Sequence, residues 1–187
     1  MSKRPVCTLF AVSCLAAAPL LAQPGPASQK ACAPLVPAEV EAALGAKLDR
    51  PLAGMAVPFA KGAARLPGET AWTCQGSAGG RSVMLSYGQE PAGPEAAKEA
   101  EARLAAPRDR LRSIGYTVQE TKLGATTCWT MAPPATKGDE PVAFGTTCGA
   151  LKGLWYYSVS VSAATAADLL PPEKVKRLAD QAAARLP

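Results

Sequence analysis

The residues best suited to chemistry in this 187-residue chain are its six cysteines, which occur in a sequence without a single histidine. Two of them, Cys128 and Cys148, each close a Thr-Thr-Cys tripeptide. Cysteines ligate metals, carry out thiol redox chemistry or form disulfides. Zinc sites and thioredoxin-type redox centres usually contain a CxxC pair, and no such pair occurs here. We therefore expect disulfides, and we expect no metal and no other cofactor.

The N-terminal residues indicate the compartment in which such disulfides would form. The chain begins with a basic patch at Lys3-Arg4, and residues 6–22 then contain no charge. A positive region, an apolar stretch and a small residue at its end are typical of a secretory signal peptide. The alternative is a retained membrane anchor, which needs about 20 apolar residues, whereas this stretch is shorter and contains Pro19. We expect residues 1–22 to be cleaved and the product to be periplasmic or secreted, with a retained segment as the alternative.

Removal of the signal leaves four cysteines, Cys32, Cys74, Cys128 and Cys148, which allow three pairings. Residues 125–131 and 142–151 both have strand-like patterns, and the connection between them is rich in turn residues. In a hairpin of these two strands Cys128 falls almost opposite Cys148, at a separation of about 5 Å that a disulfide bridges after slight relaxation. Cys32 is then left to pair with Cys74, so all four are expected to act as structural crosslinks.

The mature chain has the size and charge of one small domain. Its 165 residues are enough for one hydrophobic core, and its formal charge is +3 after the loss of Lys3 and Arg4. Basic residues are scattered among acidic ones, with the densest cluster at 108–112, so we expect no nucleic-acid partner. Residues 23–30 are predicted to be a flexible linker and residues 31–187 a single domain. No second long apolar segment occurs, so no stable membrane span is expected after signal cleavage.

The elements that position the cysteines are predicted from hydrophobic periodicity. Helices are expected at residues 35–45, 95–114 and 172–186. Strands are expected at residues 71–77, 82–87, 116–123, 125–131, 142–151 and 154–162. Pro107 should kink or split the second helix, and residues 46–70 show no clear pattern. Hairpins interspersed with helices predict an α+β fold, in which an antiparallel sheet of hairpins carries about three helices packed on one face.

A weak internal similarity links the two halves of the domain. Thr73-Cys74 and Thr147-Cys148 each precede a glycine turn, an alternating strand and a helix opened by Pro-Glu. An ancient duplication would produce this similarity, and so would two α–β hairpin units with ordinary patterning. The sequence leaves both explanations open.

Several kinds of catalytic site are excluded by the residue types. Without histidine the chain cannot build a Ser-His-Asp or Cys-His nucleophile system, and it lacks the GxxxxGKS/T and GxGxxG phosphate-binding motifs. A glycosidase needs two converging carboxylates. The candidates are Glu90, Glu120, Asp139 and Glu140, each at a position where a solvated carboxylate is equally expected. A lysine-activated serine remains available, but no particular Ser and Lys are favoured.

Aromatic side chains are the remaining candidates for binding. Trp72 and Trp129 stand close to cysteines in the sequence, so we expect them to pack on the disulfides, and the alternative is an aromatic patch that binds sugar, peptide or lipid. Tyr156 belongs to the alternating strand at 154–162 and lies on the strand face that otherwise carries serines. It is therefore predicted to be exposed, and it is the candidate ligand contact.

Several short segments recur in a recognisable order over most of the mature chain. They are Ala31-Cys32, Leu35, AEVEAALG at 38–45, Cys74, LGA at 123–125, KGLWY at 152–156 and LADQAAARL at 178–186. Together they resemble small exported domains of the bacterial cell envelope that have no known function. The resemblance implies a disulfide-paired α+β domain, a link between Cys32 and Cys74, and an envelope location. Many such domains are lipoproteins, but no lipobox precedes Cys32, and the resemblance implies no activity because fold alone does not determine function.

These observations predict an exported, non-enzymatic binding or structural module whose partner is an envelope protein or a small ligand. The alternative is a secreted hydrolase that uses carboxylate or Ser/Lys chemistry. The two differ in their sites. A hydrolase needs titratable groups that converge in a concave pocket, whereas a binding module needs an apolar groove or surface.

Overall fold

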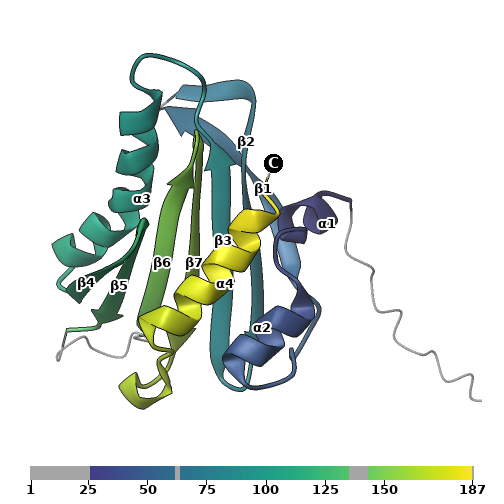
Figure 1. Cartoon of the computed structure of the whole chain (residues 1–187), viewed down its shortest axis with the longest axis vertical. Coiled ribbons are helices and arrows are strands. Elements are labelled where there is room, and N and C mark those ends of the chain that lie inside the picture. Colours follow the sequence, from purple (N-terminus) through teal and green to yellow (C-terminus); the bar gives the residue numbers. More distant parts are fainter. Residues whose placement is uncertain (1–25, 62–63, 135–142, 187) are drawn as a thin grey trace, which may run out of the picture.

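The computed structural model describes residues 26–61, 64–134 and 143–186. The predicted signal peptide at residues 1–22 therefore lies outside the described residues. Within them the chain forms a seven-stranded antiparallel sheet and four α-helices, which confirms the predicted α+β class. Figure 1 shows the sheet, whose strand order is β1-β2-β3-β7-β6-β5-β4.

The strands are β1 (Ala53–Lys61), β2 (Ala64–Ala78), β3 (Arg81–Gln89), β4 (Thr117–Leu123), β5 (Thr126–Ala132), β6 (Phe144–Lys152) and β7 (Trp155–Ala163). The helices are α1 (Pro26–Cys32), α2 (Pro37–Leu44), α3 (Ala96–Ser113) and α4 (Pro172–Ala184), with a short 3-10 helix at Ala166–Asp168. The second of these helices ends as predicted at Gly45, which has the left-handed φ of 72° that glycine adopts without strain.

One face of the sheet, which we call the core face, is covered by α1, α2 and α4. Figure 1 shows α4 lying across the front of the sheet, where it contacts mainly β6 and β7. Its Val175 and Leu178 are buried, and beneath it alternate residues of β3 and β7 such as Leu85 and Val159 have no exposed surface. Just before α4, Leu170 O accepts a hydrogen bond of 2.7 Å from the Thr146 hydroxyl of β6. The main hydrophobic core therefore lies between α4, α2 and the centre of the sheet.

The longest helix, α3, packs on the opposite face, which we call the groove face. Because successive strand residues alternate between faces, Gly149 lies on the face opposite Cys148. A Cβ atom on Gly149 would lie 3.1 Å from Cδ2 of Leu104 in α3, whereas Cys148 contacts the start of α4. The helices predicted at residues 35–45, 95–114 and 172–186 therefore do not all share one face, because the second of them, α3, lies opposite the other two. The spacing of apolar residues along a helix shows that one stripe packs, but it does not show which face of a sheet receives it.

The structure also bears on two local predictions. Residues 26–30, which were predicted to belong to a flexible linker, form most of α1. This helix is held to the sheet by Ser28, whose Oγ accepts a hydrogen bond of 2.8 Å from the backbone N–H of Gly54. Of the two effects predicted for Pro107, a kink or a split, the split does not occur, because α3 continues through this residue.

The strand β1 and the first part of β2 lie in residues 46–70, where the sequence shows no clear pattern. The inward-facing residue Gly54 is small because α1 approaches closely, and a Cβ atom there would lie 2.6 Å from Cβ of Ala31. The outward-facing Met55 is apolar and yet 54% exposed. β1 therefore lacks the alternation of apolar and polar residues that identifies a half-buried strand.

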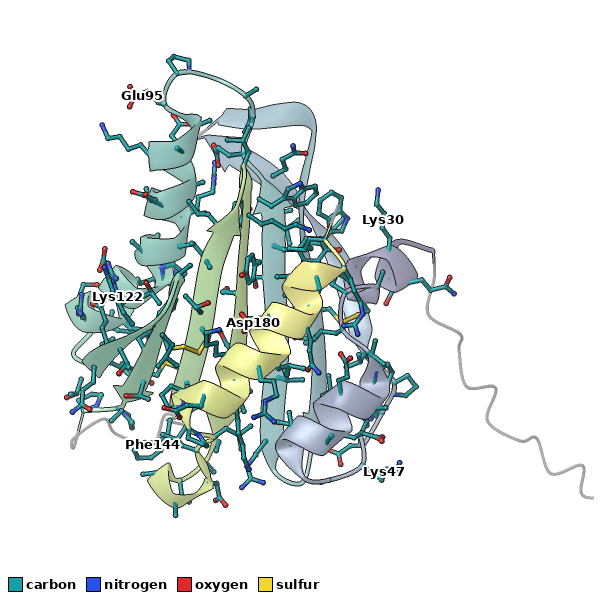
Figure 2. All side chains as sticks on the ribbon, viewed as in Figure 1. Lys30, Lys47, Glu95, Lys122, Phe144 and Asp180 are labelled. Atoms are coloured by element: carbon teal, nitrogen blue, oxygen red, sulfur yellow. A yellow bond between two sulfur atoms is a disulfide. The ribbon has the colours of Figure 1, made fainter. Side chains whose placement is uncertain are left out.

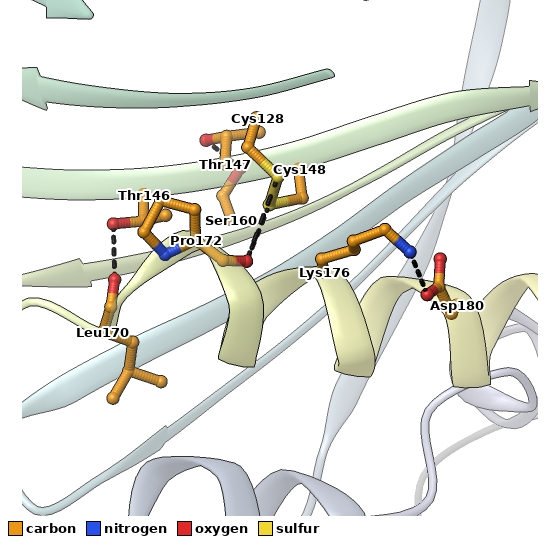
Figure 3. Close-up of a disulfide and its surroundings, with 9 residues drawn as sticks. All are labelled: Cys128, Thr146, Thr147, Cys148, Ser160, Leu170, Pro172, Lys176 and Asp180. Atoms are coloured by element: carbon orange, nitrogen blue, oxygen red, sulfur yellow. Dashed lines mark hydrogen bonds and ion pairs between the residues drawn. A yellow bond between two sulfur atoms is a disulfide. The ribbon is translucent and has the colours of Figure 1, made fainter. Parts of the chain in front are cut away.

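Both predicted disulfides are present, and both lie on the core face. Cys32–Cys74 joins the end of α1 to β2 with a Cα–Cα distance of 4.9 Å, and Cys128–Cys148 joins β5 to β6 at 4.0 Å. Cys128 faces Cys148 directly in the strand register, as the hairpin predicts. Figure 3 shows this bond beside the first turn of α4, where Pro172 O lies 3.3 Å from Cys148 Sγ.

An aromatic cluster closes the core face next to α1. The Trp72 ring stacks on Tyr87, with centroids 5.4 Å apart, and on Trp155 at 6.2 Å. Lys30 projects from α1 with its Nζ 5.1 Å from the Trp72 ring centroid (Figure 2). The Tyr87 hydroxyl donates a hydrogen bond to Lys30 O, and burial raises the pKa of Tyr87 to about 12. Trp72 therefore belongs to an aromatic cluster beside α1 and also packs against the hydrophobic core.

The strand pairing repeats with a constant offset of 74 residues. Cys74 of β2 faces Leu85 of β3, and 74 residues further on Cys148 of β6 faces Val159 of β7. Leu85 and Val159 themselves face each other at the centre of the sheet, and the same offset relates the β1–β2 register to that of β5–β6. The strands thus have an approximate two-fold axis, which favours a duplication, whereas α3 and α4 pack on opposite faces and do not follow it.

Candidate functional site

A groove of about 1110 Å³ opens on the groove face, between α3 and the sheet. Its wall is the part of α3 from Arg103 to the residue after the helix, Ile114, and its floor is formed by β2, β3, β7, β6 and β5, with Ala53 of β1 at the edge. Arg50 and Pro51 stand at one end, just before β1. Among the described helices only α3 packs on this face, mainly over β7, β4 and β6. The floor over β3, β2 and β1 therefore has no described helix above it.

The floor is made of small hydroxylated side chains because these alternate with the core residues along each strand. Ser86 of β3 faces Ser158 of β7, and Ser160 faces Thr147 of β6, whose hydroxyl donates to Ser160 Oγ at 2.9 Å. The hydroxylated residues that line the groove are Ser77, Ser82, Ser86, Thr147, Ser158, Ser160 and Ser162. Their small volume leaves space above the sheet, so the groove has a polar floor.

Exposed large apolar side chains share the groove face with these hydroxylated residues. The described residues include four exposed large hydrophobic side chains: Met55 at 54%, Val57 at 37%, Met84 at 41% and Ile114 at 48%. Met84 and Ile114 line the groove, and the strand alternation of β1 places Met55 and Val57 on the same face, because Gly54 between Ala53 and Met55 points to α1. Clustered exposed apolar groups of this kind mark interaction surfaces in soluble proteins.

The wall formed by α3 is only partly covered by the sheet. Along this helix, only Ala96 and Ala100 are buried. Further along, Leu104, Pro107, Leu111 and Ile114 follow one another at spacings of three, four and three residues, and all four line the groove. Residues at such spacings share one side of a helix. The stripe therefore contacts the sheet along one edge and presents its other edge to the groove.

One end of the groove is held by a buried ion pair. Glu90 follows β3, and its side chain has no exposed surface. Arg103 of α3, whose side chain is 27% exposed, donates from Nε to Glu90 Oε2 at 2.5 Å. The guanidinium also lies 6.0 Å from the ring centroid of Tyr156. A buried carboxylate without a charge partner is strongly destabilising. Arg103 must therefore stay beside Glu90, and this contact fixes the position of α3 relative to the end of β3.

Tyr156, the predicted ligand contact, lies in this groove but is half-buried rather than exposed. Its hydroxyl packs against Gly88 of β3, where a Cβ atom would collide with it. Burial raises the pKa of Tyr156, an effect that Arg103 opposes and Glu90 reinforces. Trp129 also lines the groove and is only 4% exposed. Strand alternation places it on the face opposite that of the adjacent Cys128. The expectation that Trp129 packs on the disulfide is therefore wrong.

Of the candidate carboxylates, the two that the structure describes, Glu90 and Glu120, do not line the groove. Glu90 pairs with Arg103, whereas Glu120 of β4 accepts hydrogen bonds from Arg108 and Arg112 on the outer part of α3. Asp139 and Glu140 lie outside the described residues. In the described part of the chain, no three His, Cys, Asp or Glu side chains gather as they would around a metal ion. The charged side chains of the groove lining are three arginines, Arg50, Arg103 and Arg110.

Sequence reasoning identified Tyr156 and the serines of β7 as one strand face, but it missed the groove itself. The apolar stripe on α3 can be seen in the sequence. The alternation of residues in β7 does not show that this stripe packs on the serine face. Across the described ranges, 26–61, 64–134 and 143–186, no helix is both long and apolar enough to cross a membrane. A scan against protein-family models finds no model that matches the chain, and a search of curated proteins finds no match either.

Proposed function

We propose that this chain is an exported binding module that uses the groove as its binding site. The observation that carries the proposal is the gathering of exposed Met and Ile side chains around a concave, hydroxyl-floored region on one face of the sheet. Burying apolar surface lowers the free energy by about 25 cal/mol per Å². A ligand that covers these exposed side chains would therefore bind favourably. A concave, largely apolar site with a few polar groups is the usual form of a binding site.

Export to the periplasm or the extracellular medium is part of this proposal. Two structural disulfides support it, because such bonds persist in oxidising compartments and are rare in the cytosol. The basic, then apolar, N-terminal sequence supports it independently. The resemblance to bacterial envelope domains points to the same location. The chain would then meet its ligand at the cell envelope.

The hydrolase alternative has less support from the groove. Hydrolysis by a carboxylate pair or by a lysine-activated serine needs those groups within hydrogen-bond distance of one another. The described lining combines serines with arginines, and it contains neither a carboxylate nor a lysine. The arrangement is therefore better suited to holding a ligand than to activating a nucleophile.

The proposal is tested with 8-anilinonaphthalene-1-sulfonate, a fluorescent probe that is both apolar and anionic. The folded, oxidised mature protein should bind this probe saturably. Ser86→Trp, which fills the groove floor, should weaken binding about tenfold or more, a loss of about 1.4 kcal/mol. Ala184→Trp, at an exposed position on α4, is the matched control and should leave binding unchanged. Absence of saturable binding, or equal binding by both variants, would refute the groove as the binding site.

A further inference from the structure

We propose that the occupant of the groove is an amphipathic α-helix of a partner protein, with acidic residues along its polar side. This inference rests on the proposed function, because it names the class of ligand that the same groove takes. It is carried by the shape of the groove, by the stripe on α3 and by the charges of the lining.

The dimensions of the uncovered floor suit one helix. Neighbouring strands lie about 4.8 Å apart, so the floor from β3 to β1 is about 10 Å wide. An α-helix with its side chains is about 10–12 Å across. A helix placed there would lie beside α3, and it would complete a two-helix layer on the groove face in the way that α2 and α4 form a layer on the core face.

The α3 stripe presents the side chains against which a second helix packs. Leu104, Leu111 and Ile114 are spaced by seven and three residues, and none of them is fully buried. Apolar residues at three- and four-residue spacings form the ridges that interlock between neighbouring helices. A partner helix would anchor there with its own residues at positions i, i+3, i+4 and i+7. An extended peptide, whose side chains repeat every two residues, would not match this spacing.

The floor favours a helix over a hydrocarbon chain. Covering the hydroxyls of Ser86, Ser158 and Ser162 with an acyl chain would remove water without supplying a hydrogen-bond partner, which costs free energy for each group. A helix brings mixed side chains, so polar ones can stand over the serines and apolar ones over Met84. The thioether side chains of Met84 and Met55 adapt to partners of different shapes.

The charges specify the polar side of the helix. Arg110 lies on α3 and Arg50 just before β1, both line the groove, and both are exposed. The third cation of the lining, Arg103, is offset by Glu90. The lining therefore has a net positive charge at its rim, and acidic residues flanking the apolar stripe of the partner would be attracted to it.

The test uses three fluorescein-labelled peptides of 18 residues, the length of α3, with the folded, oxidised mature protein. The first has a leucine stripe at three- and four-residue spacing and glutamates elsewhere. The second replaces the glutamates with lysines, and the third scrambles the first so that the spacing is lost. Fluorescence anisotropy at low salt should show the acidic helix binding about tenfold or more tightly than either of the others.

Matched charge reversals then locate the contact. Arg110→Glu should weaken binding of the acidic helix about tenfold. Arg177→Glu, an exposed arginine on α4 at the other face, should change it less than about twofold. Both arginines are exposed, so both variants are expected to fold, and near-ultraviolet circular dichroism checks this.

Each remaining outcome refutes the helix as the occupant of the groove and shows whether the proposed function fails with it. Equal binding of the scrambled or the basic peptide would refute it, as would displacement of anilinonaphthalenesulfonate by sodium dodecanoate when no peptide displaces it. A concentration-dependent dimer that Ser86→Trp abolishes would make a second copy the occupant instead. In these cases the groove remains a binding site. If anilinonaphthalenesulfonate itself fails to bind, the proposed function fails together with the helix.

Discussion

Removal of each disulfide should destabilise the domain by a similar and large amount. The Cys128–Cys148 bond joins residues 20 apart and the Cys32–Cys74 bond residues 42 apart. In the loop-entropy model these lengths correspond to about 3 and about 4 kcal/mol of unfolding free energy. Cys74, Cys128 and Cys148 are all fully buried, so replacing either pair with alanine also leaves a cavity that costs about 1 kcal/mol. The double-alanine variants should therefore lose about 4 kcal/mol (Cys128 and Cys148) and about 5 kcal/mol (Cys32 and Cys74), a large share of the roughly 5–15 kcal/mol typical of a domain.

Urea unfolding followed by tryptophan fluorescence measures this loss. The dependence of the unfolding free energy on urea should become steeper in both variants, because an unfolded chain without the crosslink exposes more surface. Fully reduced wild-type protein is the control and should be less stable than either variant, since it lacks both bonds. A loss below about 1 kcal/mol for both pairs would contradict the loop-entropy reasoning. Mass mapping that finds the thiols of Cys128 and Cys148 free in the exported protein would contradict the pairing.

Two further predictions concern buried polar groups. Arg103→Ala leaves the fully buried Glu90 carboxylate without its charge partner, so urea unfolding should show a decrease of about 3–5 kcal/mol in the free energy of unfolding. Replacing both residues, Glu90→Leu with Arg103→Leu, should largely restore this free energy. A decrease below about 1 kcal/mol in the single variant would contradict the role of the pair. The pKa of Tyr87 is raised to about 12 by burial, and a raised pKa in the folded state stabilises it fully below the ordinary tyrosine value near 10. This contribution is lost as the pH rises from about 10 through about 12. The melting temperature should therefore decrease less steeply with pH over that range in Tyr87→Phe than in the wild type, and equal slopes of melting temperature against pH would contradict the raised pKa.

The parts of the fold that the sequence predicts well are those defined by local pattern. The strand β7 is recognised because its apolar residues point to the core and its serines to the other face, and α4 because Val175, Leu178 and Ala182 recur at helical spacing. The Cys128–Cys148 pairing follows from the symmetry of a hairpin about its own turn. Each of these inferences uses residues that are close in sequence.

The parts that the sequence does not predict depend on contacts between distant segments. β1 is missed because α1 covers its small residues, and Met55 remains exposed on the other side. The depth at which Tyr156 lies is missed because its cover comes from Arg103, more than fifty residues away.

The sequence by itself determined the four crosslinking cysteines, the α+β class and the division of each central strand into an apolar and a hydroxylated side. Only the tertiary structure decided that α3 lies over the hydroxylated side and leaves a groove there. The physical reason is that periodicity shows which side of a helix or strand is apolar. The surface against which that side packs depends on how the whole chain folds. A helix that buries only half of its stripe looks the same in sequence as one that buries it all.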